Sequence, residues 1–417
     1  MAGSEYDVVV IGAGAAGLAA TRTLAGAPIS SVLLEARGRI GGRAHTVAPW
    51  RNLPLDLGPE WLHSADRNLL ARVIEAAGFA IDRTPPHWLR QSGNLAMSAQ
   101  EQADFRAANE AFRRRLEAAA DRGEEGAAAA WLAPGCRWNA LIDAISSYYN
   151  GAEYDQVSLQ DYIGYDETGV SWRVVEGYGA ALAAVADVEA HLDCAVSRID
   201  HSGARVIVTT AHGDLSARAV IVTLPTSLMA DGALAFSPDL PAKRAAAEGL
   251  PLGLADKVFL ALDEPEALPL EGHFFGHADR TATGSYNTRP MGRPVIEGYF
   301  GGRCADALER EGEGALAAFA MDELAGLLGS GVRSTIRPIV ATAWRRDPWT
   351  LGAYSHALPG RSGERAVLAE PVDDRLFFAG EACSTHLYST VHGAWQTGEV
   401  AALRALTALG APLPGDG

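Results

Sequence analysis

The fold is decided by residues 6–17, which read Tyr6-Asp7-Val8-Val9-Val10-Ile11-Gly12-Ala13-Gly14-Ala15-Ala16-Gly17. The first six residues are a short apolar run, rich in β-branched side chains, which is typical of a strand buried in a parallel sheet. The pattern turns helical over residues 15–24, and residues 31–35 predict a second buried strand. A strand, a helix and a parallel strand in this order form a right-handed β-α-β unit. We therefore expect an α/β protein that begins with a doubly wound, mainly parallel sheet.

The three glycines of this stretch have separate roles in binding a dinucleotide. Gly12 permits the tight turn after the strand, Gly14 lets a pyrophosphate approach the backbone, and Gly17 lets the helix pack on the strand. Free N–H groups at the start of the helix attract the phosphate charge. Glu35 lies 18 residues beyond Gly17, where a carboxylate accepts hydrogen bonds from ribose hydroxyls. This Rossmann-like unit predicts a dinucleotide site that includes Gly12, Gly14, Ala15, Ala16, Gly17 and Glu35.

Length, charge and cysteine content restrict the class of protein. A chain of 417 residues is expected to hold two domains. Its net charge of −16 disfavours nucleic acid as a partner. Such an acidic surplus usually serves solubility, and the alternative is that it attracts cationic amines. The four cysteines form no C-x-x-C pair, which argues against a zinc or dithiol site. Without a signal-peptide pattern or an apolar run of the ~18 residues that span a membrane, we expect a cytoplasmic protein with no membrane partner.

The rest of the chain mixes helical and strand-like segments. Helices are expected over residues 66–77, 99–122 and 391–408, and Ser98 and Glu101 have the spacing of a capping box. Strands are expected at residues 204–209, 219–223, 257–262, 295–300 and 375–380.

The segment after Glu35 indicates which dinucleotide binds. Residues 36–43 resemble the second flavin signature of the flavin-containing amine oxidase superfamily, which implies FAD rather than NAD. Gly41 and Gly42 permit close approach of the backbone, and Arg43 offers planar donors to the diphosphate. The cofactor-binding residues implied by this segment are Ala36, Arg37, Gly41, Gly42 and Arg43.

Further blocks extend the resemblance along nearly the whole chain, to the monoamine and polyamine oxidases in particular. Residues 55–63 resemble the segment that runs along the isoalloxazine ring, Val196 matches the position that meets the adenine, and Trp344 opens a block that ends at Gly360. Residues 378–398 match the C-terminal flavin block, whose helix directs its N-terminus at the flavin pyrimidine. The cofactor-binding residues implied here are Leu57, Gly58, Pro59, Glu60, Trp61, Val196, Trp344, Gly380, Glu381, Thr390 and Val391.

The activity implied by the resemblance is FAD-dependent amine oxidation. A hydride leaves the amine α-carbon for flavin N5, the imine hydrolyses, and O₂ reoxidises the flavin to give H₂O₂. Lys257 matches the lysine that holds a water against N5, and it is the predicted catalytic residue. On the residues alone, a strand-edge lysine with its ammonium in solvent is the expected role of Lys257, and the resemblance reverses this expectation. The FAD is expected to be non-covalent, because relatives that bond it covalently use a Cys where this chain has Ala353.

Four residues are implied in substrate binding: His63, Tyr354, Tyr388 and Thr390. Monoamine-oxidising relatives place two facing rings before the flavin, and here Tyr354 supplies one while Thr390 takes the place of the other, unless Tyr388 replaces it. The open wall favours a polyamine or another bulky or secondary amine over a small arylalkylamine. His63 matches a histidine of several polyamine-oxidising relatives, and a non-catalytic histidine fits equally.

Several alternatives remain at this stage. An L-amino-acid oxidase needs an Arg for the carboxylate, and Arg173, Arg289 or Arg303 could serve. A protoporphyrinogen oxidase, a carotene desaturase and a non-catalytic flavin-bearing interaction protein share the fingerprint. No second strand-glycine-helix unit for NADPH is present, and His273 and His277 lack a third ligand for a metal.

We predict two interleaved domains with the cleft between them. Residues 1–80, 176–248 and 345–417 are expected to form the FAD-binding domain, and residues 81–175 and 249–344 an α+β substrate-binding domain. A monomer or a homodimer is expected, with a small-molecule amine and O₂ as the partners.

Overall fold

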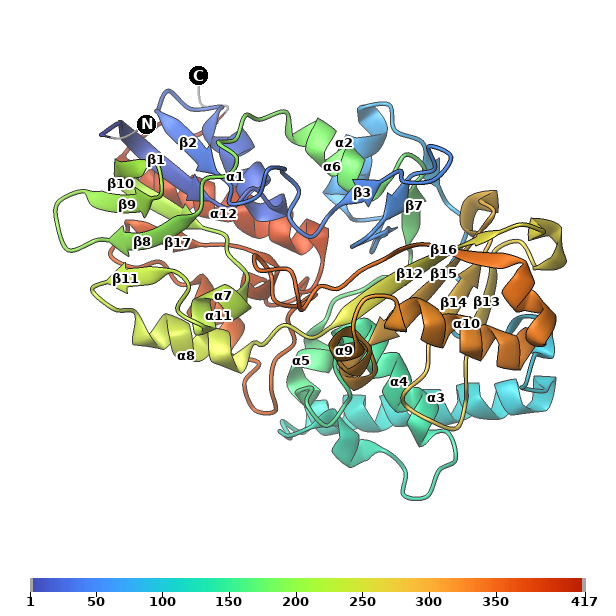
Figure 1. Cartoon of the computed structure of the whole chain (residues 1–417). Coiled ribbons are helices and arrows are strands. Elements are labelled where there is room, and N and C mark those ends of the chain that lie inside the picture. Colours follow the sequence, from blue (N-terminus) through green and yellow to red (C-terminus); the bar gives the residue numbers. More distant parts are fainter. Residues whose placement is uncertain (1–2, 415–417) are drawn as a thin grey trace.

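The computed structural model describes residues 3–414. Figure 1 shows its two larger sheets at opposite ends of the molecule, the one that contains β1 on the left and the one that contains β12 on the right. The first and last described residues both lie beside the first sheet.

The first sheet has seven strands in the order β11-β8-β9-β10-β1-β2, with β17 also paired to β10. Its strands are β1 (Glu5–Ile11), β2 (Ser31–Leu34), β8 (Val196–Asp200), β9 (Val206–Thr210), β10 (Gly213–Val222), β11 (Ala235–Ser237) and β17 (Leu376–Phe378). Strand β10 pairs in parallel with β1 and β17, and its first half pairs antiparallel with β9. The parallel pairing of β1 with β2 around a helix confirms the predicted β-α-β unit.

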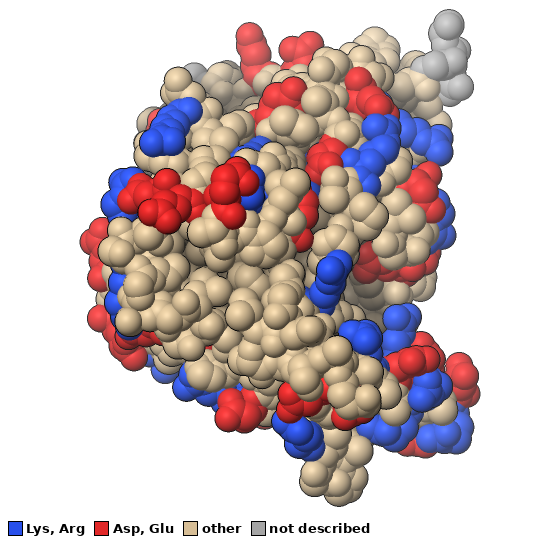
Figure 2. Space-filling model, turned by 90° about the vertical axis from the view of Figure 1, so that its right-hand side faces the viewer, with Lys and Arg blue, Asp and Glu red and all other residues tan. Residues whose placement is uncertain are grey.

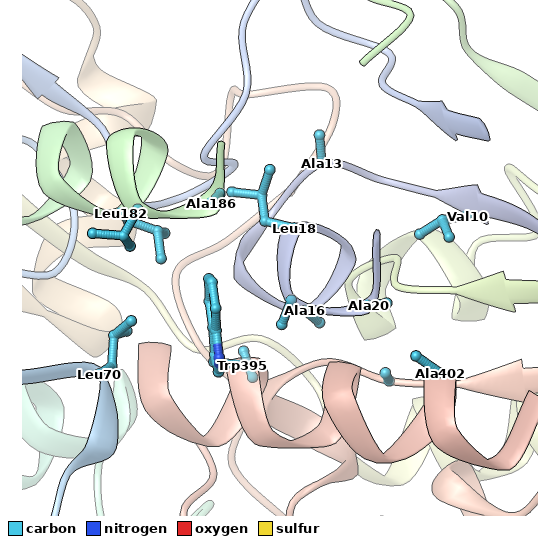
Figure 3. Packing of buried hydrophobic residues seen from close by; sticks show 14 of the residues in the cluster. Val10, Ala13, Ala16, Leu18, Ala20, Leu70, Leu182, Ala186, Trp395 and Ala402 are labelled. Atoms are coloured by element: carbon cyan, nitrogen blue, oxygen red, sulfur yellow. The ribbon is translucent and has the colours of Figure 1, made fainter. Parts of the chain in front are cut away.

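Helices cover both faces of this sheet. One face carries α1 (Ala15–Leu24), α2 (Leu69–Ala76), α6 (Tyr178–Ala186) and α12 (Val391–Leu409), and the other carries α7 (Thr226–Ala230), α8 (Pro241–Gly249) and α11 (Glu364–Ala369). Figure 3 shows Ala16 and Ala20 of α1 above Trp395 and Ala402 of α12. The two helices cross closely, since a Cβ on Gly398 would lie 2.0 Å from the carbonyl oxygen of Ala16. Small residues therefore bring the cofactor-facing ends of both helices together.

The second sheet is antiparallel, with the order β13-β14-β15-β12-β16. Its strands are β12 (Ala255–Leu262), β13 (Gly272–Phe275), β14 (Ser285–Thr288), β15 (Val295–Gly301) and β16 (Ile336–Ala341). Val258 and Leu260 pack under α9 (Gly302–Glu311) and α10 (Ala315–Leu328). Because successive strand residues face opposite sides, Lys257 points away from these helices.

A helical layer and small pieces complete the fold. The layer contains α3 (Ala99–Asp121), α4 (Asn139–Asn150) and α5 (Leu159–Gly164). Two small sheets pair β3 (Thr46–Val47) with β4 (Leu55–Asp56), and β7 (Trp172–Val174) with β5 (Trp61–Leu62) and β6 (Ile81–Asp82). Short 3₁₀ turns are Ser92–Asn94, Ala128–Trp131, Pro265–Ala267, Pro290–Gly292, Ser330–Ser334 and Glu381–Cys383. Within residues 3–414, no helix is long and apolar enough to cross a bilayer.

Most predicted elements are present, and the two largest shifts of a start are those of α2 and β10. The capping box of Ser98 and Glu101 begins α3 as predicted. Helix α2 begins at Leu69 and not at residue 66, because the Asn68 side chain accepts the N–H of Leu70 and caps the helix there. Strand β10 begins at Gly213, earlier than the predicted residue 219.

The strands of the two sheets alternate along the chain, since β12–β16 lie in sequence between β11 and β17. The exact domain boundaries remain a prediction, and residues 1–2 and 415–417 of the outer segments lie outside the described residues. The small sheet of β5, β6 and β7 crosses the boundary predicted after residue 80.

Candidate functional site

One cavity of about 700 Å³ extends from the glycine-rich turn after β1 to the free face of the second sheet. It brings together nearly all of the residues implicated by the sequence. These lining residues are Gly12, Gly14, Ala15, Ala16, Glu35, Ala36, Arg37, Gly41, Gly42, Arg43, Leu57, Gly58, Pro59, Glu60, Trp61, His63, Val196, Lys257, Trp344, Tyr354, Gly380, Glu381, Tyr388, Thr390 and Val391. Gly17 does not line the cavity.

The glycine-rich turn has the geometry that a dinucleotide requires. Gly12 has a φ of 96°, in the region that favours glycine. A Cβ on Gly17 would lie 1.8 Å from the carbonyl oxygen of Gly12, so this glycine packs the helix on the strand. A Cβ on Gly14 would meet nothing within 4 Å, because this residue faces the open cavity. The turn therefore fits a pyrophosphate beside Gly14.

Glu35 organises the next part of the cavity. Its buried carboxylate accepts hydrogen bonds from the N–H of Ala13 at 2.7 Å and the N–H of Arg37 at 2.8 Å. The Arg37 guanidinium donates to Asp347 at 2.8 Å. These bonds hold the glycine-rich turn, the end of β2 and the segment after β16 in one arrangement, and ribose binding by Glu35 remains a prediction.

Arg43 and Glu381 form an ion pair at 2.9 Å. Glu381 also accepts hydrogen bonds from the Ser355 hydroxyl at 2.7 Å and the Ser389 N–H at 2.9 Å. Burial alone would raise the pKa of Glu381, but Arg43 and the hydrogen bonds hold it below its ordinary value. The carboxylate is therefore ionised and fixed, and it cross-links segments that are far apart in the sequence.

The segment predicted to lie along the flavin ring is tightly held. A Cβ on Gly58 would lie 2.0 Å from the carbonyl oxygen of Arg43, so only glycine fits there. The Trp344 indole donates to the carbonyl of Leu57 at 3.3 Å, and its backbone N–H donates to Asp256 at 3.1 Å. Trp344 therefore ties this segment to the second sheet.

Lys257 is buried in the cavity wall, with 3% of its surface exposed. The alternative of a solvated strand-edge lysine is therefore wrong, because β12 is a central strand of its sheet. The ammonium donates to the carbonyl of Asp56 at 3.1 Å and lies 2.6 Å from a Glu297 oxygen. Burial would lower the pKa of Lys257, but Glu297 and Glu60 raise it, so the lysine is charged.

Tyrosines surround the space beside Lys257. The Tyr354 hydroxyl donates to the carbonyl of Tyr148 and lies 3.3 Å from the Tyr299 hydroxyl. The Arg365 guanidinium, paired with buried Asp161 at 2.6 Å, lies 3.8 Å from the centre of the Tyr388 ring. Tyr388 is therefore held in place by a cation–π contact.

Thr390 caps α12 as well as lining the cavity. Its hydroxyl accepts the N–H of Gly393 at 3.0 Å and donates to the carbonyl of Leu387 at 2.6 Å. Val391 and Ala394, in the first turn of the helix, also line the cavity. The start of α12 is therefore fixed where its positive dipole end meets the cavity.

His63 lies in a polar group near aromatic rings. Its Nδ1 is 3.2 Å from Glu167 and 3.2 Å from the Ser171 hydroxyl, and its ring lies 5.9 Å from that of Trp88. By contrast, His273 is satisfied by the carbonyl of Arg90 and the hydroxyl of Ser285. In the described part of the chain, no cluster of His, Cys, Asp and Glu has the makings of a metal site.

The structure adds lining residues that the sequence argument missed. They are Trp88, Tyr148, Tyr149, Tyr165, Glu167, Glu297, Tyr299 and Trp349. Glu297 carried a usable signal, since it is a lone acid within the apolar run of residues 295–300. The tyrosines of α4 and Tyr165 just after α5 carried none, because tyrosines in and beside helices are equally typical of a core.

Comparisons with known proteins agree with this geometry. The model of flavin containing amine oxidoreductases matches residues 137–406, and that of NAD(P)-binding Rossmann-like domains matches residues 10–77. Polyamine oxidase 3 of Oryza sativa subsp. japonica is 30% identical over 95% of this chain and 88% of its own length. Lysine-specific histone demethylase 2 of Homo sapiens is 26% identical over 94% of this chain and 52% of its own length.

Solved structures show the same fold. Putrescine oxidase bound to putrescine superposes with a TM-score of 0.78 at 19% identity, covering 97% of this chain and 99% of that one. Cyclohexylamine oxidase from Brevibacterium oxydans gives 0.76 at 20% identity with the same coverage. At this identity the likeness concerns the fold.

Proposed function

Because this chain belongs to the flavin-containing amine oxidoreductase family, we propose that it is an FAD-dependent oxidase of polyamines or other bulky or secondary amines. The flavin, when bound, accepts a hydride from the amine α-carbon and passes the electrons to O₂, which yields H₂O₂. The imine product then hydrolyses to an aldehyde and a shorter amine.

The observation that carries the proposal is one continuous cavity with a dinucleotide end and an amine end. Gly14, Arg43 and the start of α12 line the dinucleotide end and would hold the phosphates and the ring, and Lys257 would hold a water beside the ring. Tyr299 and Tyr354 line the amine end, where they would pack against the carbon chain and exclude bulk water, which would favour the neutral amine that gives up a hydride.

The arrangement of arginines favours an amine over an amino acid. Arg173 is buried and committed to Asp82 and Glu271, while Arg289 pairs with Glu266 and Arg303 with Asp155. None of these three lines the cavity, so none is placed to hold a substrate carboxylate. Within residues 3–414 the arginines that do line it are Arg37 and Arg43 at the cofactor end and Arg113, which is paired with Glu117.

Two further points support a polyamine. The similar rice protein is named a polyamine oxidase, and position 390 holds a small side chain instead of a ring. Surface charge is less decisive, since Figure 2 shows acidic and basic side chains interspersed on the face that carries the right-hand end of Figure 1. The net charge of −16 still favours the approach of a polycation over the molecule as a whole.

The test is peroxide formation by the purified FAD-loaded protein with spermidine, an N-alkylated monoamine, benzylamine and a panel of L-amino acids. We expect the highest kcat/KM for spermidine or the N-alkylated amine. Benzylamine as clearly the best substrate would contradict the open cavity. Turnover of amino acids alone would assign the protein to the amino-acid oxidases, and no turnover with stable yellow colour would indicate a flavin-bearing interaction protein.

A further inference from the structure

Three ionisable side chains from separate segments meet in the wall of the cavity. They are Lys257 on β12, Glu297 on β15 and Glu60 just before β5. The lysine nitrogen lies 2.6 Å from Glu297 and 3.7 Å from Glu60. All three side chains are buried, with Glu297 only 2% exposed. The cluster therefore contains two carboxyls and one ammonium in a place that water barely reaches.

The strand register fixes the two members on the sheet. Lys257 pairs with Tyr299 and Phe259 pairs with Glu297 across β12 and β15, so the lysine and the glutamate are diagonal neighbours on one face. That face lines the cavity, and the opposite face packs under α9 and α10. The ion pair is thus built into the backbone ladder rather than formed by mobile surface side chains.

The surrounding charges decide where the proton of this cluster lies. Two arginines lie near the cluster, and both are engaged elsewhere. Arg173 of β7 donates hydrogen bonds to Asp82 and Glu271. Arg293 donates to the carbonyl of Val175. Burial and the neighbouring Glu297 charge raise the pKa of Glu60 to about 8. Lys257 outweighs burial at Glu297 and lowers its pKa. Two buried carboxyls beside one ammonium cannot both ionise easily, so the more distant one keeps its proton.

We propose that Glu297 is a positioning residue that holds the Lys257 ammonium at the cavity wall, and that Glu60 carries the proton that this cluster exchanges near neutral pH. The proposal rests on the proposed function, in which Lys257 faces the flavin ring. Glu297 acts only through the lysine. Without it, Lys257 turns toward Glu60, the ammonium leaves its place beside the ring, and Glu60 ionises at a lower pH.

The first measurement needs no flavin. Thermal unfolding of the flavin-free wild type, Glu60→Gln and Glu297→Gln is followed from pH 5 to pH 9. A carboxyl whose pKa is raised in the folded state contributes less stability as pH rises from its ordinary pKa through the raised one, so the wild type carries this loss and Glu60→Gln does not. Glu297→Gln keeps Glu60 and should show a smaller loss that ends at a lower pH. The Tm of Glu60→Gln relative to wild type should therefore rise by about 3 °C or more over this range. Parallel curves would overturn the assignment of the proton to Glu60.

The second measurement uses the FAD-loaded protein. The visible flavin spectrum is titrated with pH, and reoxidation of the photoreduced flavin by O₂ is timed. We expect the flavin spectrum of the wild type to change near pH 8, and Glu60→Gln should remove this change. Glu297→Gln should move the change to a lower pH and slow reoxidation at least fivefold. Glu297→Asp should restore most of the rate. Unchanged spectrum and rate in Glu297→Gln would overturn the positioning role.

Asp256→Asn is the matched control. Asp256 is on the same strand and fully buried, and burial and Glu309 raise its pKa to about 8, but it lies on the opposite face of β12. Because asparagine keeps an oxygen that accepts the N–H of Trp344, this variant should change the pH dependence of Tm as Glu60→Gln does, yet keep the flavin transition near pH 8. A flavin titration altered as in Glu60→Gln would overturn the placement of the exchanged proton in the cavity. Because unfolding is measured without flavin or amine, failure of the proposed function is distinguished from failure of this inference.

Discussion

Lys257 shows how a single residue depends on neighbours that the sequence does not place. A charge inside an apolar strand at residues 257–262 predicted a special residue, and the resemblance supplied its role. Glu297 has the same signature inside residues 295–300, but only the pairing of β12 with β15 shows that the two charges meet. Single unusual residues could therefore be found from sequence, whereas their contacts follow from strand register.

We predict that Lys257→Met retains FAD but slows flavin reduction, reoxidation or both by about tenfold, which is less than the ~10²-fold of a direct general acid or base because the lysine acts through a water. Methionine also leaves Glu297 buried without its partner, so the Tm should fall. Stopped-flow absorbance of the two half-reactions measures the rates.

Lys243→Met is the control for loss of a buried lysine. Lys243 donates to the carbonyls of Val367 and Leu368 near the end of α11 and does not line the main cavity. It should lower the Tm and leave both half-reactions at the wild-type rate. Wild-type rates in Lys257→Met would return that lysine to a purely structural role.

At the scale of elements, the sequence placed helices and strands better than it placed their ends. The start of α2 was missed because the Asn68 cap was overlooked, and the Thr390 cap of α12 was likewise not anticipated. Residue types that cap helices are also common in loops. A cap is therefore recognised only when the structure shows its side chain accepting an N–H from the first turn of the helix. Thr390 is predicted from the sequence both to bind the cofactor and to stand in place of a ring, and neither prediction includes the cap.

Thr390→Val should lower the free energy of unfolding by about 1 kcal/mol, because it leaves the Gly393 N–H without its side-chain acceptor. Denaturant unfolding measures the change. Thr390→Ser keeps the hydroxyl and should stay close to wild type, and equal losses in both variants would contradict the cap. Thr390→Tyr narrows the cavity and removes the cap at the same time. The substrate preference of Thr390→Tyr is therefore compared with that of Thr390→Val, which removes only the cap.

At the scale of the whole molecule, the class of fold followed from five ordered sequence blocks. The cavity did not, because its aromatic and acidic walls come from α4, α5 and β15, whose side chains meet only after all layers pack. Long-range packing of this kind leaves no local periodicity to detect.

The cofactor should dissociate from the denatured protein. Position 353 is a buried alanine whose carbonyl accepts from Arg43, so no thiol is offered there. Acid precipitation should leave the FAD in the supernatant, measured by its absorbance and by mass spectrometry of the intact chain. Ala353→Cys is the matched variant, since it restores the residue used by covalent relatives. Flavin that remains with precipitated wild-type protein would contradict the prediction.

Net charge gives a prediction for the molecule as a whole. A charge of −16 creates a negative field that draws a polycation toward the cavity, and salt shortens the range of that field to about 10 Å at 0.1 M. We expect kcat/KM for spermidine to fall about three- to tenfold between 20 and 300 mM NaCl, because steering grows with the charge of the substrate. The kcat/KM of a singly charged N-alkylated amine should change much less.

The interspersed charges seen in Figure 2 limit local capture on that face, so the effect must come from the field of the entire surface. Equal salt dependence for the two substrates would show that the acidic surplus serves solubility and not substrate capture.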